Sequence, residues 1–140
     1  MKRLLLSLCC LLLLGSIQGF AGDDMRDPGL VGTWTGIDNK NVSGGYIFNR
    51  DGTVIMIQED QLVDVSKEGG SAIWRTDTGK TPAHLDILLN FGDGGSAQLL
   101  MIYNLLQKNQ LLMRHSLSRE RPTTFLELSD ETQIVLYRKD

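Results

Sequence analysis

The side chains best suited to chemistry in this 140-residue sequence are two histidines, His84 and His115. Asp86 follows His84 by two residues, so both side chains lie on one face if this segment is a strand. An imidazole beside a carboxylate can move protons or bind a metal ion, but either role needs further converging groups. The sequence offers none beside this pair. We therefore interpret His84 and Asp86 as solvated or locally hydrogen-bonded, and we expect no catalytic residues, no metal site and no cofactor.

Two further segments suggest ligand sites, and each has a structural interpretation. Arg114, Arg119 and Arg121 form a basic cluster that Glu120 offsets, and we expect a solvated loop there rather than an anion site. Residues 92–96 are rich in glycine but lack the Lys-Ser/Thr pair and the following helix of a phosphate-binding loop. No nucleophile elbow, zinc-protease helix or dinucleotide fingerprint is present in the sequence. We therefore expect that the protein is not an enzyme.

The N-terminus has the pattern of a cleavable signal peptide. Lys2 and Arg3 precede an unbroken apolar stretch over residues 4–14, and Gly19 and Ala21 place small residues at the −3 and −1 positions of a cleavage site. The apolar stretch is shorter than the roughly 20 residues that a membrane-spanning helix needs, so we expect no stable membrane anchor. The sequence predicts a signal peptide at residues 1–21 and one secreted or periplasmic domain at residues 22–140.

Cysteine content and charge exclude several function classes. Cys9 and Cys10 both lie in the predicted signal peptide, so the mature domain has no thiol, disulfide framework or cysteine metal site, even in an oxidising compartment. The whole chain has a formal net charge of −3, and removal of Lys2 and Arg3 makes the domain more acidic. Such a charge balance does not attract phosphate backbones, so we expect no nucleic-acid partner.

The pattern of apolar runs predicts an all-β fold. About eight short apolar runs follow Pro28-Gly29, at residues 30–37, 45–50, 53–58, 71–75, 84–91, 97–106, 111–117 and 133–138. Glycine with Asn or Asp separates many of them, and no stretch keeps helical periodicity for three turns. Short loops between sequential strands favour a small up-and-down antiparallel β-barrel, because closing the sheet removes its exposed edges.

Two predicted hairpins bear on which side chains point inward. If Asp51-Gly52 is a two-residue turn, the strands pair so that four large apolar side chains share the inner face: Tyr46, Phe48, Ile55 and Ile57. A three-residue loop would break this parity. The hairpin that turns at Lys108-Asn109 has apolar side chains on both faces of residues 97–106, so either face can point inward. The outward row must then pack on a terminal segment, a loop or another molecule.

The two ends of the predicted domain carry motifs of a known family. Leu30-Val31-Gly32-Thr33-Trp34 is similar to the Gly-x-Trp opening of the first strand in lipocalins and their calycin relatives, and Tyr137-Arg138 is similar to the end of their last strand. The resemblance implies that Trp34 plugs one end of the barrel beneath Arg138. It also implies structural roles for Gly32, Trp34 and Arg138.

Longer motifs extend the resemblance over nearly the whole domain. In chain order they are Lys80-Thr81-Pro82-Ala83-His84-Leu85-Asp86, Ile102-Tyr103-Asn104-Leu105, Arg121-Pro122-Thr123-Thr124-Phe125 and Leu136-Tyr137-Arg138. The sequence thus resembles a lipocalin-like family of uncharacterised secreted bacterial domains that is abundant in planctomycetes. It departs from that family at Met101, where glycine is usual, and at residues 107–110, which replace a tight Gly-Asp turn. The family brings no established activity, so the resemblance implies an architecture and not a ligand.

Three function classes remain, and we favour a binding module. A barrel of this size either fills with its own side chains or holds one small apolar ligand, which here would be lined by Trp34, Tyr46, Phe48, Ile55 and Ile57. The alternative is a protein-interaction module, such as an inhibitor or envelope assembly factor, with a filled and purely structural core. It would use the spare apolar face around Leu100, Ile102 and Leu106 or the loop ends, and a stable partner or a homodimer would favour it. An enzyme would rest on His84 and Asp86 alone.

Overall fold

The structure is a computed structural model, which describes residues 25–38, 40–116, 119–127 and 132–140. The predicted signal peptide at residues 1–21 lies outside the described residues. The described part contains two short 3-10 helices, η3 (Pro28–Leu30) and η4 (Val65–Glu68), and nine strands. The strands are β1 (Gly32–Ile37), β2 (Ser43–Phe48), β3 (Val54–Gln58), β4 (Gln61–Val63), β5 (Ser71–Asp77), β6 (Ala83–Asn90), β7 (Ser96–Gln107), β8 (Gln110–His115) and β9 (Gln133–Lys139). Within these ranges, no helix has the length and apolar character needed to cross a membrane.

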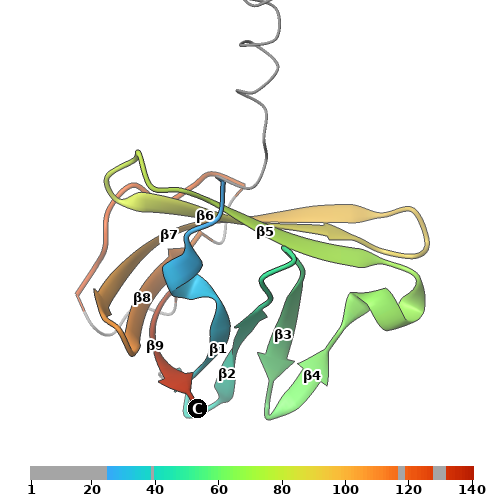
Figure 1. Ribbon diagram of the computed structural model, residues 1–140, viewed down its shortest axis with the longest axis horizontal. Coiled ribbons are helices and arrows are strands. Elements are labelled where there is room, and N and C mark those ends of the chain that lie inside the picture. The colour runs from blue at the N-terminus through green and yellow to red at the C-terminus, as the bar shows by residue number, and fades with distance from the viewer. Residues whose placement is uncertain (1–24, 39, 117–118, 128–131) are drawn as a thin grey trace, which may run out of the picture.

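The described strands form one antiparallel sheet in the order β4-β3-β2-β1-β9-β8-β7-β6-β5. Sequential strands pair as a meander, and β9 returns to pair with β1. The sheet curls until β3 and β5 approach, where Thr53 bridges Ile73 and the Trp74 N–H donates to the Gly52 carbonyl at 3.0 Å. Figure 1 shows β5, β6 and β7 lying across the layer that contains β1, β2 and β3. The fold is therefore a curled half-barrel, which confirms the all-β, barrel-like prediction.

The described part has one strand more than the sequence predicts. The additional strand is β4, which is three residues long and follows a two-residue turn at Glu59-Asp60. Glu59 and Asp60 both have positive φ, 52° and 65°, as a tight hairpin turn with matching twist requires. Neither residue is glycine, so the sequence gives only a weak signal for this hairpin.

The loop between β2 and β3 contains three residues, not the predicted two. The Asn49 N–H donates to the Thr53 carbonyl at 2.9 Å, and the Gly52 N–H donates to the Asn49 carbonyl at 3.0 Å. Gly52 has a φ of 94°, in the left-handed region. A tight turn followed by a left-handed glycine is a common three-residue hairpin connection, and here it replaces the expected two-residue turn.

This loop corrects the predicted pairing of the hairpin by one residue. Phe48 pairs with Val54 and Tyr46 pairs with Met56, whereas the two-residue turn would have paired them with Ile55 and Ile57. Because side chains alternate between faces along a strand, a shift of one residue exchanges the faces. Val54 and Met56 therefore join the inner face, and Ile55 and Ile57 lie on the outer face.

The inner face of the curled sheet is packed as a solid core over most of its extent. Trp34 on β1, Phe48 on β2 and Trp74 on β5 have exposed fractions of 0, 1 and 1%. The rings of Phe48 and Trp74 lie 5.2 Å apart, centroid to centroid. The surrounding buried side chains are mainly aliphatic: Leu85, Ile87, Met101, Leu111, Met113 and Leu136. The aromatic residues thus connect β1–β3 to the crossing strands.

The structure resolves which face of β7 points inward. Met101 and Tyr103 join the core, so Ile102 points outward, yet Ile102 has an exposed fraction of 0%. The segment at residues 119–127 fastens to this outer face, because Arg121 Nη1 donates to the Met101 carbonyl at 2.7 Å and Arg114 Nη1 donates to the Thr124 carbonyl. Ile102 is therefore not part of a spare apolar surface. These two arginines hold the segment in place, and do not form the expected solvated loop.

Candidate functional site

One end of the half-barrel is closed by η3 and by Arg138. The Trp34 Nε1–H donates to the Leu30 carbonyl at 2.8 Å, which ties the indole to η3. Arg138 donates from Nη1 to the Val31 carbonyl and from Nη2 to the Gly29 carbonyl, at 2.7 and 2.8 Å. Its guanidinium carbon lies 4.3 Å from the Trp34 ring centroid, which is the placement that the lipocalin resemblance implies. This end is plugged by side chains and leaves no room for a ligand around Trp34.

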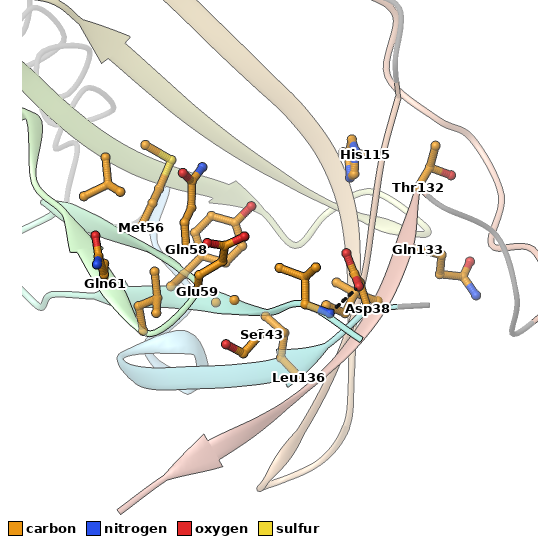
Figure 2. A pocket seen from close by; sticks show the side chains of 17 residues that line it. Asp38, Ser43, Met56, Gln58, Glu59, Gln61, His115, Thr132, Gln133 and Leu136 are labelled. Atoms are coloured by element: carbon orange, nitrogen blue, oxygen red, sulfur yellow. Dashed lines mark hydrogen bonds between the residues drawn. The ribbon is translucent and has the colours of Figure 1, made fainter. Parts of the chain in front are cut away.

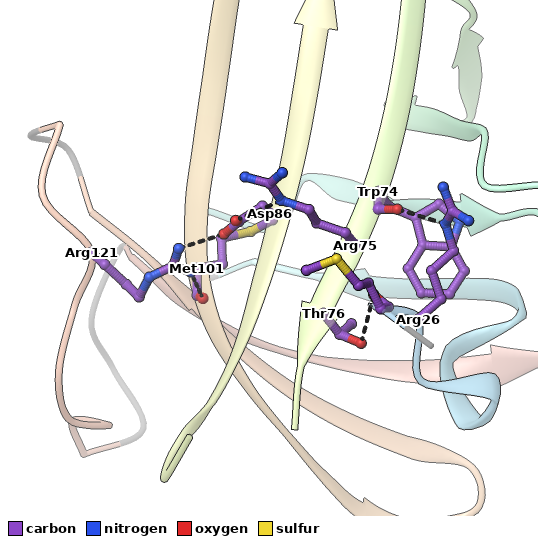
Figure 3. Close-up of polar contacts among 8 residues, drawn as sticks. Arg26, Trp74, Arg75, Thr76, Asp86, Met101 and Arg121 are labelled. Atoms are coloured by element: carbon purple, nitrogen blue, oxygen red, sulfur yellow. Dashed lines mark hydrogen bonds and ion pairs between the residues drawn. The ribbon is translucent and has the colours of Figure 1, made fainter. Parts of the chain in front are cut away.

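The segment before η3 is anchored by polar contacts that sequence analysis missed. The Asp27 Oδ1 accepts from the Gly29 N–H at 2.9 Å and its Oδ2 accepts from the Tyr103 hydroxyl at 2.8 Å. The Asp27 N–H donates to Thr76 Oγ1 at 2.7 Å. Arg26 Nε donates to the Trp74 carbonyl at 2.9 Å (Figure 3). An aspartate before Pro-Gly is a helix-start signal, and that signal could have located this anchor.

The contact between Tyr103 and Asp27 makes stability depend on pH. Burial, followed by the hydrogen bond to the Asp27 carboxylate, raises the pKa of Tyr103. Since the folded-state pKa lies above that of an unfolded tyrosine, the stabilisation is present below about pH 10 and is lost as the pH rises further. We expect Tyr103→Phe to flatten this alkaline loss and to cost about 1 kcal/mol at neutral pH.

Urea unfolding at several pH values from about 9 to 11.5 measures how the free energy of unfolding falls over the range in which tyrosine titrates. Some alkaline loss will remain in the variant, because burial also raises the pKa of Tyr46. A slope of unfolding free energy against pH that is the same in wild type and Tyr103→Phe would contradict the role assigned to Tyr103.

The opposite end of the half-barrel contains a cavity of about 640 Å³. Its walls come from β2, β3, β4 and β9, with the end of β8 at one side (Figure 2). The apolar part of the wall consists of inner-face residues: Tyr46, Met56, Val63, Ile134 and Leu136. Polar side chains surround it: Asp38, Gln58, Glu59, Gln61, His115, Thr132 and Gln133. The site thus combines an apolar interior surface with a polar rim.

Two glycines at the start of β2 create room at this cavity. Gly44 lies on the same strand face as Tyr46 and Phe48, so the cavity wall is bare backbone at that point. Gly45 faces the other way, and a Cβ there would lie 1.8 Å from the Trp34 carbonyl oxygen. Glycine at position 45 thus lets the backbones of β1 and β2 approach closely beside the cavity.

Tyr46 contributes a polar group to the otherwise apolar part of the wall. Its ring stacks on Phe48 with 5.6 Å between centroids, and burial raises the pKa of its hydroxyl. Among the described residues, none provides a hydrogen-bond partner for this hydroxyl. The hydroxyl therefore stays protonated at neutral pH and is available to a molecule in the cavity.

The structure separates the residues that the sequence grouped as ligand-lining. Trp34 and Phe48 are fully buried in the solid core, whereas Tyr46 lines the cavity. Ile57 lies on the outer face of β3, whose inner-face residues are Val54 and Met56, but it still borders the cavity. Ile55 does not line the cavity. Sequence analysis missed the other lining residues, since those on β3 depended on the hairpin register and those on β4, β8 and β9 on the sheet order.

Asp86, which the sequence places on one strand face with His84, has two arginine partners in the structure. Asp86 Oδ2 accepts from Arg75 Nε at 3.2 Å, and its Oδ1 accepts from Arg121 Nη2 (Figure 3). Burial, and then the positive charge of Arg121, lowers the pKa of His84. Because both carboxylate oxygens are bound by arginines, Asp86 serves to fasten the 119–127 segment. Within the described residues no group of three His, Cys, Asp or Glu side chains could hold a metal ion.

Searches against protein-family models, curated proteins and solved structures give no match. The sheet order and the strand register define the architecture. On that basis the chain is an all-β protein with a curled, barrel-like antiparallel sheet, closed at one end by Trp34 and Arg138 and hollow at the other.

Proposed function

We propose that this chain is a secreted or periplasmic lipocalin-like binding module that holds a small, largely apolar molecule at the open end of its barrel. The observation that carries the proposal is the cavity of about 640 Å³ at the end of the barrel opposite Trp34 and Arg138. Small-molecule sites typically occupy about 300–1,000 Å³ and combine apolar walls with a few polar groups. The wall of Tyr46, Met56, Ile134 and Leu136, with its polar rim, has this character.

The division between core and cavity supports binding over a purely structural role. Trp34, Phe48 and Trp74 pack as a buried core away from the open end. The fold therefore does not depend on filling the open end with side chains. An apolar hollow without occupant forfeits dispersion contacts, and glycine at position 44 adds no side chain to fill this one. We propose binding without catalysis, since both oxygens of the Asp86 carboxylate are engaged in ion pairs with arginines.

Filling the cavity with a side chain is expected to block binding. In Met56→Trp the indole would occupy space on the inner face of β3, whereas Ile55→Trp places the same side chain on the outer face of the same strand. We expect N-phenyl-1-naphthylamine, an uncharged fluorescent probe, to bind wild type saturably and Met56→Trp at least about tenfold more weakly. Ile55→Trp should bind within about twofold of wild type, a difference of under 0.5 kcal/mol.

Fluorescence titration of the three proteins measures these affinities, with circular dichroism to establish that each is folded. Saturable binding that Met56→Trp leaves intact would place the probe elsewhere and contradict the proposed site. An equal loss in both variants would show that the tryptophan acts through general destabilisation of β3.

A second candidate function is self-association through the outer face of the sheet. Ile37, Leu62 and Tyr137 have exposed fractions of 63, 58 and 52%, and the strand registers place all three on the outer face of the layer formed by β1–β4 and β9. Large apolar side chains gathered on one face favour a protein partner. Lys139 and Asp60 flank the patch. In a two-fold interface the Lys139 of one copy can face the Asp60 of the other, and the reverse pair forms as well, so a second copy of the chain is a suitable partner.

A further inference from the structure

We infer that the cavity selects amphipathic molecules with a hydrocarbon body and a cationic head, and discriminates against those with an anionic head. This inference rests on the proposed function and adds the chemical class of the ligand. It is carried by the charges at the cavity mouth. The lining residues that the structure describes include two carboxylates, Asp38 and Glu59, and no lysine or arginine.

Both carboxylate residues are fixed to the same short stretch of backbone. The Asp38 N–H donates to the Val42 carbonyl at 3.0 Å, and the Glu59 N–H donates to the Ser43 carbonyl at 2.9 Å. Val42 and Ser43 are consecutive residues at the start of β2, so the two acidic residues lie at one end of the barrel on either side of that strand. Figure 2 shows both side chains at the cavity, Asp38 near Gln133 and Glu59 near Gln58.

The orientation of Asp38 is set by its own loop. Its Oδ1 accepts from the Lys40 N–H at 2.8 Å and the Val42 N–H at 2.9 Å. These two contacts hold the Asp38 carboxylate in place beside the start of β2. The turn that carries Glu59 is held to β2 as well, because Ser43 Oγ donates to Asp60 Oδ1 at 3.1 Å. The negative charges at the mouth are therefore built into the hairpin ends.

The apolar wall provides the other half of an amphipathic site. Met56 and Ile134 line the cavity and pack against the buried core, and Leu136 belongs to both. The Tyr46 hydroxyl lies among these residues and can accept a hydrogen bond from an ammonium or hydroxyl head. A hydrocarbon chain buried here would leave its head at the level of Asp38 and Glu59. A cationic head gains attraction there, whereas a carboxylate head meets like charges.

A matched series of ligands tests this inference. Decylammonium, decanol and decanoate share one hydrocarbon chain, and each can displace bound N-phenyl-1-naphthylamine from wild-type protein at pH 8 and low salt, where histidine side chains are generally uncharged. We expect decylammonium to bind most tightly, decanol next, and decanoate at least about tenfold more weakly than decylammonium. The carboxylates at the cavity mouth attract an ammonium head and repel a carboxylate head. Raising the salt concentration should narrow this difference by screening the charges.

Glu59→Gln removes one charge from the mouth with little change in shape. We expect it to weaken decylammonium binding about three- to tenfold and to strengthen decanoate binding. The matched control is Glu68→Gln on η4, a residue outside the cavity lining, which should leave the order and size of the affinities unchanged.

The outcomes separate the inference from the proposed function. Binding of decanoate as tight as that of decylammonium overturns the charge preference and leaves the cavity as a binding site. An equal effect of Glu59→Gln and Glu68→Gln also overturns it, because the preference would then reflect the net charge of the protein. If neither the probe nor any ligand of the series binds, the proposed function itself is wrong.

Discussion

Replacing Trp34 with alanine is expected to lower the free energy of unfolding by about 3–5 kcal/mol. The side chain is completely buried, and its Nε1–H donates to the Leu30 carbonyl at 2.8 Å. Its ring also supports the Arg138 guanidinium, which in turn binds the Val31 and Gly29 carbonyls. Truncation therefore leaves a cavity and loosens the contacts that hold η3 over the end of the barrel.

Urea unfolding followed by circular dichroism measures this loss. Tyr137→Ala is a suitable control because this aromatic side chain on β9 has an exposed fraction of 52%, and we expect it to cost about 0.5 kcal/mol or less. If Trp34→Ala does not fold, Trp34→Phe keeps a ring but loses the indole donor, and we expect a cost of about 1–3 kcal/mol. A cost for Trp34→Ala as small as that of Tyr137→Ala would contradict the assignment of Trp34 as the plug.

Gly45→Ala is expected to be at least as damaging, although it adds a single methyl group. An added Cβ would lie 1.8 Å from the Trp34 carbonyl oxygen and 3.0 Å from the Thr35 Cα. Both atoms belong to the backbone of β1, so relief requires the two strands to separate. We expect a loss of more than about 4 kcal/mol, at the extreme of single substitutions, or failure to fold.

Gly44→Ala provides the matched control on the neighbouring residue. Its added Cβ would meet the Ile57 carbonyl oxygen at 3.1 Å, a contact that a small shift can relieve. We expect this variant to fold and to lose about 1 kcal/mol, comparable to ordinary substitutions. Thermal unfolding of the two variants side by side measures the difference, and equal stability of Gly45→Ala and wild type would contradict the close approach of β1 and β2.

The strand pattern was predictable from the sequence because apolar runs and glycine-containing gaps alternate along most of the chain. The turn at Lys108-Asn109 also follows, since Gln107 pairs with Gln110 around it. Strand β4 did not follow, because its turn uses left-handed Glu59 and Asp60 in place of glycine. Local signals thus located the strands wherever the turns used the usual residues.

The candidate site was much harder to predict because it depends on pairings between distant strands. Met56 reaches the cavity only through the three-residue loop at Gly52, which sequence analysis recognised as an alternative but did not select. Ile134 and Leu136 come from β9, whose return to β1 completes the wall. Ile102 was expected on a spare surface, yet the 119–127 segment fastens over it through Arg121. Such contacts join residues far apart in sequence. The alternation of side chains between the two faces of a strand does not predict which distant strands will pair.

The most direct test of the account is native mass spectrometry of the protein produced from its full gene in a secreting host and recovered from the periplasm or medium. We predict one protein copy carrying an added mass on the order of a few hundred daltons, as expected for a small-molecule site. This mass should be released on denaturation and be absent from Met56→Trp. A dimer without added mass would favour self-association through the Leu62 and Tyr137 face. A bare monomer in both proteins, or the same added mass in wild type and Met56→Trp, would contradict a ligand in the open end of the barrel.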